Sequence, residues 1–124
     1  MAKYSHTIKL VEGDTLPELF IKLKDANAGE PNQPYDPEDP NTWATVALVG
    51  ASVKLKIRKL GSSTLKSEID CDVWDGPNGQ ILVYFPEGTW DEAGTFEGEV
   101  EVTFSTGGKQ TVHSLIKFKV RGDF

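Results

Sequence analysis

Hydrophobic and polar residues alternate with a period of two along most of the chain, and no long stretch keeps a helical period. The clearest alternation lies in GASVKLKIRKLG (50–61), where three apolar residues interleave with three cations: Val53, Leu55 and Ile57 with Lys54, Lys56 and Arg58. A strand of this kind packs one face on a core and leaves the other in water. We therefore expect a half-buried strand here, with the aliphatic side chains in the core.

Six other segments show a similar pattern and are bounded by residues that favour turns. They are YSHTIKLVEG (4–13), LPELFIKLKD (16–25), KSEIDCDVW (66–74), GQILVYFP (79–86), GTFEGEVEVTF (94–104) and QTVHSLIKFKV (110–120). In the second of them Leu19, Ile21 and Leu23 share one face. The turn residues of DGPNG (75–79) and STGGK (105–109) predict two hairpins. Short strands at this spacing predict an all-β sandwich formed by a single domain, residues 1–124.

One segment interrupts the alternation. Between Asp25 and Gly50 the chain reads DANAGEPNQPYDPEDPNTWATVALVG, with a proline at every third position from 31 to 40. Prolines at this spacing favour an extended loop and exclude a central strand. We expect residues 25–44 to form a long proline-rich inserted loop, which in a compact domain is commonly functional, and TVALV (45–49) to form a short edge strand at its end.

The glutamates of GTFEGEVEVTF are the first candidates for chemistry. Glu97, Glu99 and Glu101 alternate along one strand, so neighbouring carboxylates lie about 6.6–6.8 Å apart, within the range of an inverting glycosidase pair. The opposite face of the strand is apolar and must be the core, so the glutamates point outward, where no pocket separates an acid from a base. We expect a solvated face in which Glu97 lies opposite Lys117 or Lys119 on the next strand.

The balance of charge narrows the classes of partner. The chain has 19 acidic and 13 basic residues, a net charge of −6, and the cations of the strand at 50–61 have no aromatic residues between them. An acidic chain with such a surface does not favour nucleic acid. No segment approaches the roughly 18 apolar residues of a membrane span. We therefore expect no nucleic acid and no membrane among its partners.

Residues that could hold a metal ion or act as a nucleophile are scattered along the chain. The acidic segments DPEDPN (36–41) and DCDVWDGPN (70–78) do not match the ligand spacing of a calcium loop. His6 and His113 have no third group in a catalytic arrangement, and Cys71, the single cysteine, is expected to be buried as a small hydrophobe. We expect no catalytic residue, no metal and no cofactor.

The tryptophans are expected to have different roles. Trp90 lies at a corner between two strands, where an aromatic ring usually closes the end of a sandwich core. Trp74 is expected to fill the gap that Gly98 leaves on the apolar face of its strand. Trp43 and Tyr35 lie on the proline-rich loop, and aromatic anchors on a loop are typical of interfaces. We expect this pair to contact a partner, with a polar rim formed by Asp36, Glu38 and Asp39.

Several short motifs follow one another in the order VEGDTLPELFIKLKD, LVGASVKLKIRKLG and NGQILVYFP…GTFEGEVEVTFSTGGKQT…FKV. This order resembles the small immunoglobulin-like tail and baseplate proteins of tailed bacteriophages, in particular the N-terminal module of upper-baseplate proteins. The matching residues are Gly13, Asp14, Thr15, Leu48, Gly50, Ala51, Val53, Gly94, Phe96, Gly107 and Gly108. The resemblance covers nearly the whole chain except Asp25 to about Ala44. It implies an immunoglobulin-like antiparallel β-sandwich of about seven strands without enzyme activity.

The resemblance also implies a function. We expect a structural protein of a tailed-phage virion, made in the host cytoplasm, that docks in the tail, baseplate or fibre attachment region. Its expected partners are other virion proteins, and we expect it to form a homo-oligomer within the assembly. Two alternatives remain open. One is a capsid decoration or head-fibre base protein of the same fold, and the other is a glycan-binding module that recognises host surface sugars through exposed tryptophans.

Overall fold

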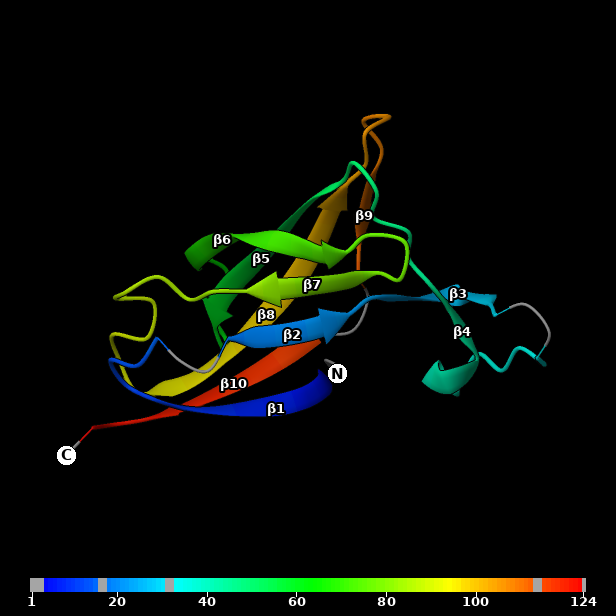
Figure 1. Ribbon diagram of the computed structural model, residues 1–124. Helices are drawn as coiled ribbons and strands as arrows, with labels where there is room; N and C mark the ends of the chain where they lie inside the picture. The colour runs from blue at the N-terminus through cyan, green and yellow to red at the C-terminus, as the bar shows by residue number, and fades with distance from the viewer. Residues whose placement is uncertain (1–3, 16–17, 31–32, 113–114, 124) are drawn as a thin grey trace.

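The computed structural model describes residues 4–15, 18–30, 33–112 and 115–123, and nearly all of the regular structure in these residues is β-strand (Figure 1). The strands are β1 (Tyr4–Val11), β2 (Leu19–Lys22), β3 (Lys24–Gly29), β4 (Trp43–Thr45), β5 (Ser52–Lys59), β6 (Leu65–Asp75), β7 (Gln80–Val83), β8 (Gly94–Thr103), β9 (Lys109–Thr111) and β10 (Leu115–Arg121). The 3-10 turn η1 (Pro40–Thr42) precedes β4.

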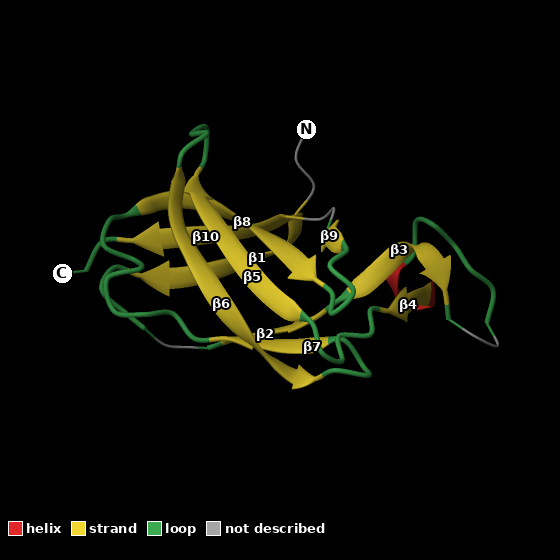
Figure 2. Cartoon of the chain, turned by 90° about the horizontal axis from the view of Figure 1, so that it is seen from above, coloured by secondary structure: helices red, strands yellow, loops and turns green. Residues whose placement is uncertain are grey.

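The strands pair in the order β1-β10-β8-β5-β6-β7-β2, with β9 beside the end of β8. The long strand β6 belongs to both layers of the sandwich, because its first half pairs with β5 and its second half pairs with β7. Figure 2 shows it crossing the molecule beside β5 toward β7 and β2. The protein is therefore an immunoglobulin-like β-sandwich, with β1, β10, β8 and β5 in the larger layer and β7 and β2 in the smaller one.

One pair of strands is parallel, whereas the sequence predicted an antiparallel sandwich. β1 runs parallel to β10, with Ile8 opposite Phe118 and Leu10 opposite Val120. A tight hairpin imposes antiparallel pairing on the strands that it joins, but β1 is followed along the chain by β2 in the other layer. Its orientation at the sheet edge is therefore not fixed by a turn.

The core forms where the alternation predicted it. Val53, Leu55 and Ile57 are buried, and Lys54 and its neighbouring cations occupy the opposite face of β5. Trp90 is buried among aromatic residues, as expected for the corner before β8. Its ring centroid lies 5.2 Å from that of Phe85 and 4.9 Å from that of Phe118. Each such contact between rings stabilises the fold by about 0.5–1.5 kcal/mol, in addition to the gain from burying the rings.

The expected core position of Trp74 is wrong. Its side chain is 65% exposed, because the alternation of β6 directs Ile69, Cys71 and Val73 inward and places Trp74 on the outer face. The gap at Gly98 is closed by Phe118 and by Leu55 instead. A Cβ at Gly98 would lie 2.8 Å from the nearest carbon of the phenyl ring and 3.0 Å from the leucine methyl.

The prediction of an extended loop between Asp25 and Gly50 is also wrong in part. β3 and β4 form an antiparallel hairpin that projects from the sandwich, and Figures 1 and 2 both show it at one end of the molecule. The prolines do not prevent this pairing, because they lie in the connection between the two strands. The strand expected at 45–49 ends at Thr45, and Val46 and Leu48 continue into the core outside any strand.

The backbone conformation explains why glycine stands at two positions of the matched motifs. Gly50 and Gly107 have φ angles of 74° and 92°, in the left-handed region that residues with a Cβ rarely adopt. Each lies in a tight turn, closed by the bond from the Ala51 N–H to the Leu48 carbonyl and by the bond from the Gly107 N–H to the Phe104 carbonyl. The resemblance at these positions is therefore a resemblance of turns.

Candidate interaction site on the projecting arm

The projecting hairpin contains all five residues that were expected to contact a partner. We call residues 24–45, from β3 through η1 to β4, the arm. Tyr35, Asp36, Glu38, Asp39 and Trp43 lie between its two strands or at the start of the second. The structure thus brings these residues together, on an element that extends away from the sandwich (Figure 1).

Thr42 organises the connection between the two strands of the arm. Its hydroxyl accepts the backbone N–H of Asp36 at 2.9 Å and lies within hydrogen-bond distance of the carbonyls of Asp36 and Asp39. The backbone N–H of Thr42 also donates to the Asp39 carbonyl, and the Thr42 carbonyl accepts the N–H of Glu30. These bonds join the part of the arm before β4 to the end of β3, so the arm has a defined shape.

Two carboxylates of the expected rim accept hydrogen bonds from backbone N–H groups within the arm. Asp36 accepts the N–H of Glu38 at 2.9 Å, and Asp39 accepts the N–H of Asn41 at 3.0 Å. Asp39 directly precedes η1, which begins with Pro40, so it acts as the N-cap of this turn. Sequence reasoning placed both residues at an interface and missed this local role, although an aspartate followed by proline is a signal for turn initiation.

The two aromatic residues of the arm differ in exposure. Trp43 is half-buried, and its indole N–H donates to the Asp36 carbonyl at 3.1 Å. Tyr35 is 42% exposed and packs against the backbone of Gly29, where an added Cβ would lie 2.7 Å from the Tyr35 Cβ. The arm therefore presents Tyr35 to solvent, whereas Trp43 contributes mainly to the shape of the arm.

The arm is strongly acidic. It contains one lysine, Lys24, and five carboxylates, which gives a net charge of −4 out of −6 for the whole chain: Asp25, Glu30, Asp36, Glu38 and Asp39. Because the arm projects from the sandwich (Figure 2), this negative charge lies away from the lysines and arginines of β5 and β10. We infer that the arm favours a partner surface with positive charge.

The outer face of the larger layer is the second candidate, because it holds the glutamates and the lysines that the sequence singled out. β5 and β8 are neighbours, and their register places Arg58 opposite Glu97, Lys56 opposite Glu99 and Lys54 opposite Glu101. The ion pairs on this face include Arg58–Glu97 at 2.7 Å, Lys56–Glu101 at 2.9 Å and Lys54–Glu68 at 3.0 Å. The acidic and the basic rows thus neutralise each other, a pairing that consideration of each strand alone did not reveal.

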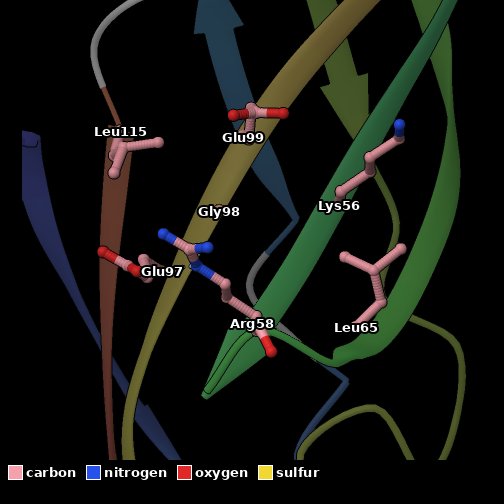
Figure 3. Close-up of a pocket in the computed structure, with 8 residues that line it drawn as sticks. Lys56, Arg58, Leu65, Glu97, Gly98, Glu99 and Leu115 are labelled. Atoms are coloured by element: carbon pink, nitrogen blue, oxygen red, sulfur yellow. Dashed lines mark hydrogen bonds and ion pairs between the residues drawn. The ribbon is translucent and has the colours of Figure 1, made fainter. Parts of the chain in front are cut away.

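Glu97 differs from the solvated residue that was expected. It points away from the core, and Lys117 lies opposite it on β10 as predicted, but only 6% of Glu97 is exposed. Figure 3 shows Arg58 extending from β5 toward it, with Leu65 and Leu115 on either side. These side chains line a small hollow of about 90 Å³. The long side chains of neighbouring strands therefore remove the carboxylate from water on a nominally exposed face.

The ionisation of nearby groups follows from these contacts. The hydrogen bond from Lys56 lowers the pKa of Glu101 below its ordinary value, and the same bond raises the pKa of Lys56. An arrangement that stabilises both charged forms does not set one carboxylate apart as an acid. Burial raises the pKa of the Cys71 thiol to about 12, so the thiol stays protonated and packs against the core, as expected for a small hydrophobe.

Other expected positions carry less information. The side chain of His6 and all of His113 lie outside the described residues. Within the described ranges, no three His, Cys, Asp or Glu residues are grouped so that they could hold a metal ion. The described part of the chain also contains no helix that is long and apolar enough to cross a membrane.

Exposed aromatic side chains gather on the outer face of the smaller layer, which the sequence did not single out. Phe20 on β2 is opposite Leu82 on β7, and Leu82 is opposite Asp72 on β6. Trp74 lies two residues beyond Asp72, and Tyr84 lies two residues beyond Leu82, so both point to the same side as this row. Phe20, Trp74 and Tyr84 are all more than half exposed. The alternation of each strand could have revealed this face once the neighbours of β7 were known.

Comparisons with known proteins give a limited result. No family model matches the chain, and no curated protein shows significant similarity to its sequence. Among solved structures, the chain is similar to CopC from Methylosinus trichosporium OB3b, with a TM-score of 0.45 and 14% identity over 100% of this chain and 88% of that one. It is also similar to murine CRIg, with a TM-score of 0.41 and 13% identity over 98% of this chain and 97% of that one. We infer no function from similarities of this size.

Proposed function

We propose that this chain is a non-enzymatic structural protein of a tailed-phage virion that docks in the tail, baseplate or fibre attachment region through its arm. The family resemblance of the sequence supports the virion assignment, and the arm supports docking. The resemblance does not include the arm, so the arm is the feature that would distinguish this protein's partner from those of the phage proteins that it resembles.

The observation that carries the docking role is the internal order of the arm. A free loop loses conformational entropy when it binds, at a cost of about 0.5–1.5 kcal/mol for each immobilised side chain. Here the bonds of Thr42, Asp36 and Asp39 already order residues 36–42, and the indole N–H of Trp43 donates to the Asp36 carbonyl. An ordered projecting element with an exposed Tyr35 and a carboxylate rim is suited to insert into a neighbouring subunit.

The station in the virion is tested by counting copies. Quantitative mass spectrometry of gradient-purified particles would compare this chain with the major capsid protein. A number that corresponds to one small ring per particle supports the tail or baseplate. Hundreds of copies would instead favour the capsid decoration or head-fibre base protein, and absence from the particle would overturn the virion assignment.

The role of the arm is tested by measuring how the purified protein binds to particles that lack this protein. Tyr35→Ala removes an exposed ring without disturbing the bonds of Thr42, and we expect it to weaken binding by about tenfold, the loss of a moderate interface anchor. Trp74→Ala is the matched control, because it removes an exposed ring from the sandwich outside the arm. Equal binding by the wild type and the Tyr35 variant would contradict docking through the arm.

A second function, from a different class, is favoured by the aromatic face of the smaller layer. Sugar rings stack on exposed aromatic side chains, and Trp74, Tyr84 and Phe20 are accompanied there by Asp72 and Gln80, which can hydrogen-bond to hydroxyl groups. A glycan-binding module would show quenching of tryptophan fluorescence by host-surface oligosaccharides, and this quenching would be lost in Trp74→Ala. Fluorescence that does not change with any oligosaccharide would remove this alternative.

A further inference from the structure

A basic groove lies at the opposite end of the molecule from the arm. The C-terminal halves of β1 and β10 line an open hollow of about 430 Å³, formed by Lys9, Leu10, Val11, Lys119, Val120 and Arg121. Its lining in the described part of the chain includes three cations and no carboxylate. Glu12 and Asp123 lie just beyond the two strands. We call this feature the basic groove.

The position of the groove makes it accessible. β1 is the last strand of the sheet on this side, so the groove opens at a sheet edge. Lys9 and Lys119 are register partners and both are exposed, and Thr95, the partner of Lys119 on β8, is uncharged. The row of glutamates on β8, from Glu97 to Glu101, therefore does not extend to this pair of lysines.

The arm and the basic groove have opposite charges and cannot meet within one molecule. The arm carries a net charge of −4, and the groove carries Lys9, Lys119 and Arg121. Figures 1 and 2 both show the arm at one end of the sandwich and the C-terminal end of β10 at the other. A contact between these two surfaces therefore requires a second copy of the chain.

We propose that the arm of one copy docks in the basic groove of a second copy, head to tail. The proposal rests on the docking role of the arm and identifies its partner as another copy of this chain. A contact of this type joins two different surfaces, so an open chain of copies has a free arm at one end and a free groove at the other. Repetition closes into a ring or continues as a filament, according to the angle between copies.

Electrostatic attraction at partly exposed surfaces depends strongly on salt. The screening length is about 20 Å at 0.02 M salt and about 4 Å at 0.5 M, so the proposed association weakens as salt is added. Contacts of the exposed anchor Tyr35 would be less sensitive to salt. The association is therefore expected to be reduced at high salt.

The test is sedimentation velocity of the full chain at low and high salt, with charge-reversal variants. Glu38→Lys reverses the charge of an arm carboxylate that accepts no described hydrogen bond within the arm. Lys119→Glu reverses the charge of an exposed lysine of the groove. Each is expected to weaken self-association by about tenfold, because an attractive pair becomes a repulsive one. The double variant restores a complementary pair and is expected to recover most of the loss. Lys22→Glu, exposed on the outer face of β2, is the control and is expected to have no effect.

The outcomes separate this inference from the proposed function. A chain that stays monomeric at low salt, or an association that the two single variants leave unchanged, overturns the head-to-tail contact. If the chain is monomeric and Tyr35→Ala still weakens binding to particles, the arm docks on a different virion protein and only the self-association is wrong. If the chain associates as proposed but is absent from particles, the virion function is wrong and the contact stands.

Discussion

The buried carboxylate of Glu97 leads to a sharp prediction about the outer face of the sheet. Its partner Arg58 is 45% exposed, whereas Glu97 is 6% exposed, so the two ends of this ion pair have very different access to water. Removal of Arg58 leaves a largely buried carboxylate in the hollow between β8 and its neighbours, with Lys117 opposite it on β10. Removal of the charge on Glu97 leaves a guanidinium that water can solvate. The two single substitutions should therefore differ in cost.

The magnitude follows from this asymmetry. Breaking a fully buried ion pair by removing one partner costs about 3–5 kcal/mol. The partial exposure of Arg58 and the Lys117 that lies opposite Glu97 on β10 both reduce this value. We expect Arg58→Met to lower the free energy of unfolding by about 2 kcal/mol, which corresponds to a fall of about 6–10 °C in Tm for a domain of this size. Glu97→Gln keeps the shape of the side chain and should cost less than about 1 kcal/mol.

Lys54 supplies a matched control on the same strand. It pairs with Glu68 at 3.0 Å, and both side chains are exposed, so Lys54→Met should change the free energy of unfolding little. The assay is equilibrium unfolding in urea at neutral pH for the three variants and for the double variant of Arg58 and Glu97. If Arg58→Met and Lys54→Met have equal effects, or if Glu97→Gln is the more harmful change, the burial of Glu97 does not determine the cost of breaking this ion pair.

Three further predictions concern the core, the response to acid and the thiol. Gly98→Ala should destabilise the fold by about 1–3 kcal/mol in the same urea assay, because a Cβ would lie 2.8 Å from an aromatic carbon of the core, whereas Gly108→Ala has nothing nearer than 3.9 Å and should be nearly neutral. The lowered pKa of Glu101 means that its contribution to stability is present above its ordinary pKa and is lost as the pH falls through the lowered value. Stability measured from pH 6 to pH 2 should therefore fall less steeply in Lys56→Met, and an unchanged slope would contradict the assignment. With its pKa raised to about 12, Cys71 should resist alkylation by iodoacetamide near pH 8 in the folded protein and react after unfolding, whereas rapid labelling of the native chain would show that the thiol is accessible.

The positions and faces of most strands could be predicted from the sequence alone. The alternation in β5 and β8 is determined by the two-residue repeat of a strand, so Val53 and Val100 had to face the core and Lys54 and Glu99 had to face outward. Turn residues likewise fixed the hairpin between β6 and β7. These features are local, because each depends on the geometry of a few consecutive residues.

The role of each outward face depended on which strands became neighbours, and that only the tertiary structure decided. Glu97 became a buried partner of Arg58, which is 39 residues away in the sequence, because β5 pairs with β8. Trp74 was expected in the core because a large side chain could fill the gap at Gly98, yet its position on the outward side of β6 leaves it exposed. The arm was predicted as a loop from its prolines, but pairing of β3 with β4 made it a projecting hairpin. Long-range pairing contributes contacts that no window of consecutive residues contains, so the candidate sites became visible only in the folded chain.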